Sequence, residues 1–207
     1  MSRFTVSCKK GQGLAIGQLL RQVAFNVNPS WRPVGYNISL GSNTLYSSPA
    51  ILPDMVTFMK NLTDLQFTIS ESLSGDILVK TFPITNGKLM VSQLSDSDIQ
   101  CVSDEKQLLG VLDNSDVTVT LIFRKGYGVY SREDNADFIA EHGYTGAGMK
   151  AMQSNHSLVS SFAFRVSETG FDTEDLIMDV VCKNKDEKTT LQSTVNVAIQ
   201  TLSAIQL

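Results

Sequence analysis

Residues 10–27 read KGQGLAIGQLLRQVAFNV, and this stretch decides how the rest of the sequence is interpreted. Three glycines open into apolar residues that recur at three- and four-residue steps, a spacing that predicts an amphipathic helix. Pro29 and Pro33 end the helical pattern, because proline does not continue a helix. Glycine-rich loops before helices often bind phosphate, so the first question is whether these glycines hold a nucleotide or permit close packing.

The glycine spacing does not fit a phosphate-binding motif. It is GxGxxxG, whereas a dinucleotide fingerprint needs GxGxxG and an acid about 20 residues later. No acid occurs between Lys10 and Asp54, and Gly17 is followed by Gln18 rather than by the Lys of a P-loop. Gly13 and Gly17 are four residues apart and share one helix face, where each glycine costs about 1 kcal/mol relative to alanine. A closely packed strand, second helix or other subunit must offset that cost.

The composition limits the classes of protein to which this chain can belong. The 207 residues carry a net charge of −4, with 42% hydrophobic and 18% charged residues, which predicts one or two globular domains. An acidic chain is not expected to bind nucleic acid on its own. Cys8, Cys101 and Cys182 form no CxxC pair and are expected to be free thiols in a reducing compartment. No apolar run approaches the roughly 18 residues of a membrane span, and the first residues lack a signal or transit pattern.

Hydrophobic periodicity and turn residues divide the remaining chain into strands and helices. The order predicts the α+β class, with a discontinuous outer unit of residues 1–29 plus 156–207 and an inserted unit of residues 30–155. We expect strands at 4–8, 34–40, 66–70, 77–82, 88–91, 117–123, 162–166 and 176–182, helices at 53–65 and 190–207, and a polar loop at 131–150.

The last helix carries apolar residues at alternating steps of four and three, the spacing of a heptad seam. Two interpretations stay open: the seam packs on the chain's own sheet, or it joins the glycine helix in a subunit interface. The candidate interface residues are Gly13, Gly17, Leu20, Leu191, Val195, Ala198, Leu202 and Ile205.

Residues 10–27 resemble the signature of the α subunit of bacterial and plastid RNA polymerase, in which a G-x-G-x-x-x-G-N-x-L-R-R-x-L-type run opens the dimerisation helix. Five further segments resemble blocks of that family in the same order. They are PAILPDMVTFMKNLTDLQFTI (49–69), QLSDSDIQ (93–100), VTVTLIFRKGYGVYSRED (117–134), NHSLVSSFAFRV (155–166) and FDTEDLIMDVVC (171–182).

The resemblance implies a non-catalytic scaffold within a nucleotidyltransferase complex. Its fold would be that of the family's N-terminal domain: a dimerisation subdomain of strands plus two helices, with an inserted mixed α/β subdomain. Two copies would pair and hold the β and β′ subunits, with DNA reached only through the complex, no membrane and no cofactor or metal in this chain. Arg21 and Gln22 fall on the family's arginine pair, so the resemblance assigns them to the large-subunit contact. Gln18 replaces the family's Asn, and Gln22 replaces its second arginine.

The sequence stops after the dimerisation helix, so we expect no C-terminal DNA-binding domain. Together with the divergence, this suggests an organellar polymerase in the plastid, with the bacterial cytoplasm as the alternative.

Other functions remain as alternatives. Asn135–Phe138 read NADF, like the start of the catalytic magnesium loop of the largest polymerase subunit, but the further aspartates of that loop are missing. Asp137, Glu141 and His142 could form a metal or catalytic cluster, which ranks last, and His156 is expected to be structural. A free-standing homodimer that binds a small ligand is the second candidate.

Overall fold

The computed structural model describes residues 1–40, 43–44, 51–70, 75–84, 86–111, 117–146, 148–183 and 186–204. The chain divides into two compact units. Unit 1 combines Met1–Pro29 with Ser157–Leu207, and unit 2 is Ser30–His156. The described residues form α-helices and mostly antiparallel sheets, which confirms the predicted α+β class.

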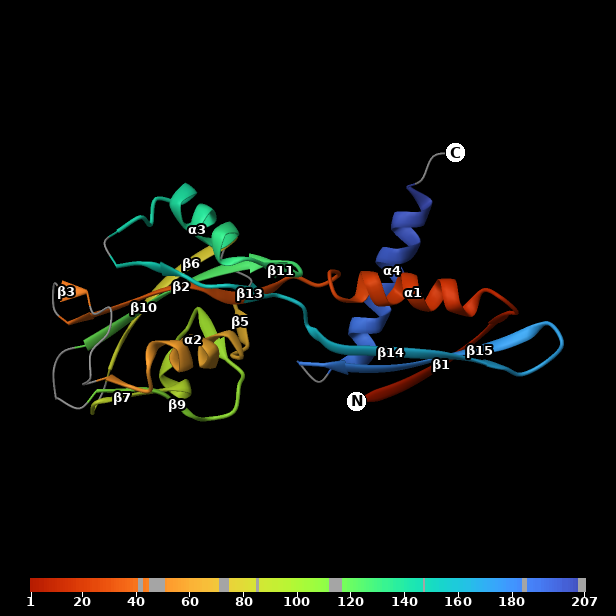
Figure 1. Ribbon diagram of the computed structural model, residues 1–207, viewed down its shortest axis with the longest axis horizontal. Coiled ribbons are helices and arrows are strands. Elements are labelled where there is room, and N and C mark those ends of the chain that lie inside the picture. Colours follow the sequence, from red (N-terminus) through yellow and green to blue (C-terminus); the bar gives the residue numbers. More distant parts are fainter. Residues whose placement is uncertain are drawn as a thin grey trace. The chain divides into compact units, whose positions relative to one another are not determined.

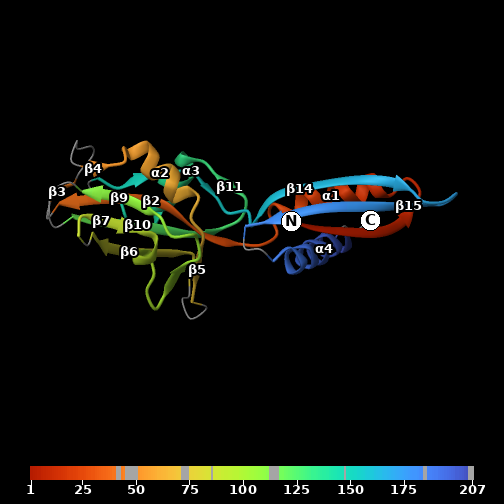
Figure 2. The same cartoon turned by 90° about the horizontal axis from the view of Figure 1, so that it is seen from below.

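Unit 1 is a three-stranded antiparallel sheet with two helices on the same side of it (Figure 1). Its elements are β1 (Ser2–Lys9), α1 (Gly13–Ala24), β14 (Val159–Glu168), β15 (Thr173–Cys182) and α4 (Glu187–Ser203). The central strand is β15, flanked by β1 and β14, and Figure 2 shows the three strands side by side. The helices cross each other, and α1 packs on β14 and β15. One sheet face therefore supports both helices.

Strand alternation explains the core of unit 1. Side chains at every second position of β15 are buried, from Glu174 through Leu176 to Cys182. They meet the buried face of α1, which includes Leu20 and Ala24. Burial of an aliphatic side chain contributes roughly 1.5 to 3 kcal/mol, so this single layer of contacts holds the helices on the sheet.

Unit 2 is built around a larger sheet with the strand order β6-β10-β2-β5-β8, to which β3 and β12 add by pairing with β2. A smaller sheet has the order β4-β9-β7, and β11 pairs with β13. The elements are β2 (Ser30–Leu40), β3 (Asn43–Thr44), β4 (Ile51–Leu52), α2 (Met55–Thr63), β5 (Phe67–Ile69), β6 (Ile77–Pro83), β7 (Lys88–Met90), a 3-10 helix (Val91–Leu94), β8 (Ile99–Cys101), β9 (Gln107–Val111), β10 (Val117–Gly126), β11 (Val129–Tyr130), α3 (Arg132–Glu141), β12 (Lys150–Ala151) and β13 (Ser154–Asn155).

Both faces of the larger sheet are covered. In Figure 1, α2 and α3 lie on opposite sides of β2 and β10. The larger core cluster contains Phe58 and Leu62 of α2, and the smaller one contains Phe138 and Ile139 of α3. This accounts for the nearly continuous apolar run of β10, which has buried residues on both faces.

The first and last residues of unit 2 are tied together. Ser30 Oγ donates to the His156 carbonyl at 2.7 Å, and His156 Nδ1 lies 2.7 Å from the Ser30 carbonyl, so Nδ1 must carry the proton. His156 Nε2 lies 2.9 Å from Ser154 Oγ, and Asn135 Nδ2 donates to that same oxygen at 3.0 Å. His156 is fully buried, and its ring is held by this hydrogen-bond network.

One sequence prediction is wrong in unit 2, and one predicted strand is longer than expected. Residues 131–150 were expected to form a loop, but they contain α3. Ser131 and Asp134 form its capping box: each side chain accepts a hydrogen bond from the other residue's backbone N–H. The strand predicted at 34–40 begins at Ser30 and runs through Pro33. The register of β2 against β10 shifts beside that proline, where an irregular ladder tolerates the missing N–H.

Candidate protein-interaction surface

The glycine-rich loop holds an anion that belongs to the chain itself. The Gly13 N–H donates to Glu174 Oε1 at 2.6 Å, at the N-terminus of α1. Hydrogen bonds from the backbones of Gly13, Gly11 and Gln12 lower the pKa of Glu174 below its ordinary value. The loop therefore uses the geometry of a phosphate site to bind a carboxylate of β15. Sequence reasoning missed Glu174, because it lies 161 residues from Gly13 and no local motif marks it.

The helix glycines face a strand of the same unit. A Cβ at Gly17 would lie 2.4 Å from Cδ2 of Phe164 on β14, and one at Gly13 would lie 2.9 Å from Glu174 Oε1. The close packing that the glycines require is thus supplied by β14 and β15. Gly13, Gly17 and Leu20 are buried within unit 1, and so is Ala198 of α4. These four predicted interface residues are therefore buried inside unit 1 and do not lie on its surface.

The rest of the predicted seam is accessible. Leu202 is 53% exposed, Leu191 and Val195 are half-buried, and Ile205 lies outside the described residues. Leu191 and Val195 line a groove of about 260 Å³ together with Phe4 of β1. Further apolar side chains are exposed on both helices. They are Leu14 (58%) and Ile16 (37%) on α1, and Ile199 (57%) on α4. Such exposed apolar groups on adjoining helices are typical of a protein contact surface.

Arg21 and Gln22 lie near the end of α1, and both are exposed. In the described part of the chain, no hydrogen bond or ion pair engages the Arg21 guanidinium. The Gln22 carbonyl accepts a long hydrogen bond from Asn26 Nδ2 at 3.4 Å. The Arg21 guanidinium is therefore accessible to a partner's carboxylate or carbonyl groups.

The three side chains of the candidate catalytic cluster do not point to a common site. Asp137 and Glu141 are exposed on α3, while His142 Nδ1 lies 2.8 Å from the Phe138 carbonyl. His142 Nε2 is 3.6 Å from Asp76 Oδ1 of the neighbouring turn. Within the described ranges, no three metal-binding side chains are grouped so that they could hold an ion. The NADF residues form part of a helix, and Asn135 is buried in the network around His156.

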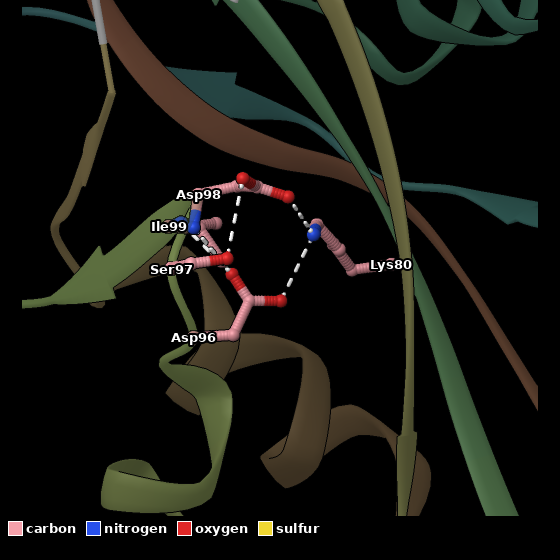
Figure 3. Close-up of polar contacts among 5 residues, drawn as sticks. All are labelled: Lys80, Asp96, Ser97, Asp98 and Ile99. Atoms are coloured by element: carbon pink, nitrogen blue, oxygen red, sulfur yellow. Dashed lines mark hydrogen bonds and ion pairs between the residues drawn. The ribbon is translucent and has the colours of Figure 1, made fainter.

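A second acidic segment is also engaged by the chain's own groups. Figure 3 shows Lys80 of β6 between two carboxylates, with Nζ 2.9 Å from Asp96 Oδ2 and 2.5 Å from Asp98 Oδ2. Asp96 Oδ1 accepts from the backbone N–H groups of Asp98 and Ile99, which fixes the turn before β8. The hydrogen bond to Lys80 lowers the pKa of Asp96. This cluster ties a loop to a strand.

The cysteines form no disulfide in the described part of the chain. Cys182 is buried, and Cys8 and Cys101 are half-buried. Burial raises the pKa of the Cys182 and Cys101 thiols, which disfavours the reactive thiolate. Among the described helices, none combines the length and apolar character needed to cross a membrane.

Comparison with known proteins gives a distant relationship to one class. No protein-family model matches the chain. The chain is 21% identical over 175 residues to the DNA-directed RNA polymerase subunit alpha of Onion yellows phytoplasma, covering 83% of this chain and 52% of that protein. It is 22% identical over 129 residues to the subunit of the same name from Campylobacter jejuni subsp. doylei, covering 62% of this chain and 38% of the relative.

These matches support an α-like relationship at low identity. The chain spans between about a third and about half of the length of these curated relatives. Both relatives are bacterial, so the comparisons do not support the plastid origin inferred from the sequence.

Proposed function

We propose that the chain is an α-like assembly subunit of a multisubunit DNA-directed RNA polymerase. It forms a homodimer that serves as a platform for the β and β′ subunits, which carry the nucleotidyl transfer. The observation that carries the proposal is the match to an α subunit over 83% of the chain. The bacterial sources of the relatives favour the bacterial cytoplasm as its location.

The dimer contact is assigned to the exposed apolar side chains of α1 and α4. In a two-fold dimer the same patch meets its own copy, so each residue there contributes twice. Leu14, Ile199 and Leu202 are each more than half exposed, and the groove at Leu191 and Val195 can receive a partner's side chain. The buried glycines and Ala198 support this surface from within unit 1.

The dimer contact is tested by a charge at its edge. Leu202→Glu places a carboxylate where the proposal requires desolvation, which costs several kcal/mol without a partner. We expect a monomer with native-like circular dichroism, measured by gel filtration with light scattering. Gln200→Glu is the matched control, because it adds the same charge to an exposed position of the same helix. A dimeric L202E protein, or a wild type that is monomeric at tens of micromolar, would contradict the proposal.

The large-subunit contact is tested separately on α1. Arg21→Ala is expected to leave the dimer intact and to weaken capture of β in mixed pull-downs, because a charge-assisted hydrogen bond is lost. Arg165→Ala, which removes an exposed arginine of β14, is the control. Undiminished β capture by folded R21A would refute the assignment.

Purification of the native protein distinguishes the main proposal from the ligand-binding alternative. An assembly subunit copurifies with very large partners, which native mass spectrometry would identify as polymerase subunits. A free dimer without large partners would favour the small-ligand module instead.

A further inference from the structure

Unit 2 contains a cavity of about 510 Å³ at the edge of its larger sheet. The short strand β12 pairs with β2 there, so the cavity lies beside the Lys150–Tyr36 and Ala151–Gly35 register. Side chains of α2, from one face of the sheet, and of the start of α3, from the other, complete its wall. A volume of this size is typical of small-molecule sites.

The floor of the cavity is mostly apolar, and its neutral polar side chains are those of Tyr36, Thr63 and Gln153. Met55, Met59 and Met152 line it, and methionine adapts its shape to varied apolar ligands. Tyr36 also lines it and is only 2% exposed. Among the described residues no hydrogen-bond partner engages the Tyr36 hydroxyl. Burial raises the pKa of Tyr36, so its hydroxyl remains a donor, while the nearby charge of Arg132 acts in the opposite direction.

The rim is positive. Lys60, Arg132 and Lys150 line the cavity, and no aspartate or glutamate among the described residues does so. This differs from the chain as a whole, in which 21 acidic residues outnumber 17 basic ones. Arg132 occupies the first turn of α3, where the helix dipole disfavours a cation. Glu133 and Asp134 complement the dipole in the same turn, and no ion pair among the described residues engages the Arg132 guanidinium.

We propose that this cavity binds an amphipathic anion: an apolar body of small-molecule size that carries one oxyanion group. The methionines take the apolar body, and Lys60 and Arg132 with the Tyr36 hydroxyl take the carboxylate or phosphate. A neutral apolar ligand would leave Lys60 and Arg132, which form no ion pair among the described residues, without a counter-charge, and a small polar anion would leave the methionine floor exposed. The site belongs to unit 2 and uses none of the residues assigned to the dimer or to the large-subunit contact.

Methionine methyl resonances provide a local measurement of binding. The protein is labelled at its methionine methyl groups and titrated with decanoate, decyl phosphate and decanol. We expect decanoate or decyl phosphate to shift the signals of Met55, Met59 and Met152, and to leave those of Met1 and Met178 in unit 1 unchanged. The ratio of the two anion affinities identifies the preferred head group. Decanol, which has the same chain without charge, is expected to bind at least tenfold more weakly.

Substitutions at the rim test the role of charge. Lys60→Gln and Arg132→Gln are each expected to weaken decanoate or decyl phosphate binding by about three- to tenfold, the range for exposed to partly buried charge-assisted contacts. Lys88→Gln, at the exposed first position of β7, is the matched control and should leave the affinity unchanged.

Three results would overturn the proposal: equal binding of decanol, binding that K60Q and R132Q do not weaken, or no shift of the three methyl signals at millimolar anion. An acidic peptide that binds where both decyl anions fail would also overturn it, in favour of a protein partner. Light scattering on the same variants measures whether the dimer is intact. If the dimer is intact and no decyl anion binds, only the cavity proposal is refuted and the dimer proposal stands.

Discussion

Replacing Gly17 with alanine sets two opposing effects against each other. In an isolated helix the change stabilises by about 1 kcal/mol, because alanine is the better helix former. In unit 1 the new Cβ would lie 2.4, 2.5 and 2.9 Å from three ring atoms of Phe164. Ordinary contacts at a Cβ begin near 3.4 Å, so the ring must withdraw by about 1 Å.

The steric effect should be the larger of the two. Overpacking in a well-packed core typically costs about 1 to 3 kcal/mol. Phe164 is half-buried between α1 and its own strand, and its ring is in contact at several atoms rather than at one flexible end. After subtraction of the propensity gain, we expect G17A to lower the free energy of unfolding by up to about 2 kcal/mol.

Urea unfolding followed by circular dichroism measures this difference. Ala15→Gly, at an exposed position of the same helix, calibrates the propensity effect and should cost about 1 kcal/mol. Gly17→Ala combined with Phe164→Leu should recover part of the loss, because the smaller side chain makes room for the methyl group. If G17A alone raises the free energy of unfolding, Gly17 is not required for close approach, and the packing argument for the glycine run is refuted.

Three further substitutions test other contacts. Because backbone N–H groups lower the pKa of Glu174 in the folded state, its charge stabilises the protein above pH 4.5, and this contribution is lost as the pH falls through the lower folded value. Glu174→Gln should therefore lower the midpoint of thermal unfolding at pH 7, with a smaller difference from wild type in strong acid. Asp96→Asn removes one of the two carboxylates that pair with Lys80, and should cost no more than about 1 kcal/mol in urea unfolding, because the pair is partly exposed. Ala198→Glu buries a charge inside unit 1 and should lose native circular dichroism, whereas a folded monomer would place Ala198 on the surface.

Elements with strong local signals were predictable from the sequence. The apolar spacing after Gly13 gave α1 within a few residues, and Pro53 with Asp54 marked the start of α2, where Asp54 accepts from the Val56 and Thr57 N–H groups. The helix α3 was missed because its buried positions are few and include the polar Asn135. The Ser131-to-Asp134 capping box was the signal that could have revealed it.

The candidate surface was only partly predictable. A helical pattern identifies residues that share a face, but it does not say whether that face meets a strand or another molecule. Gly17 and Ala198 carried the expected small-residue signal, and both are buried within unit 1. Glu174 and the cavity around Tyr36 depend on segments far apart in sequence, so no local motif could indicate them.

The reciprocal hydrogen bonds between Ser30 and His156 bear on how unit 1 folds. In the sequence of unit 1, unit 2 is an insertion of more than a hundred residues between Pro29 and Ser157. Closing a flexible loop of that length costs on the order of 3 kcal/mol more than closing a tight turn. When unit 2 folds first, its ends meet at Ser30 and His156, and the effective loop shrinks to a few atoms. The folded inserted unit then brings the chain segments of α1 and β14 together. A synthetic short turn in place of unit 2 should have the same effect.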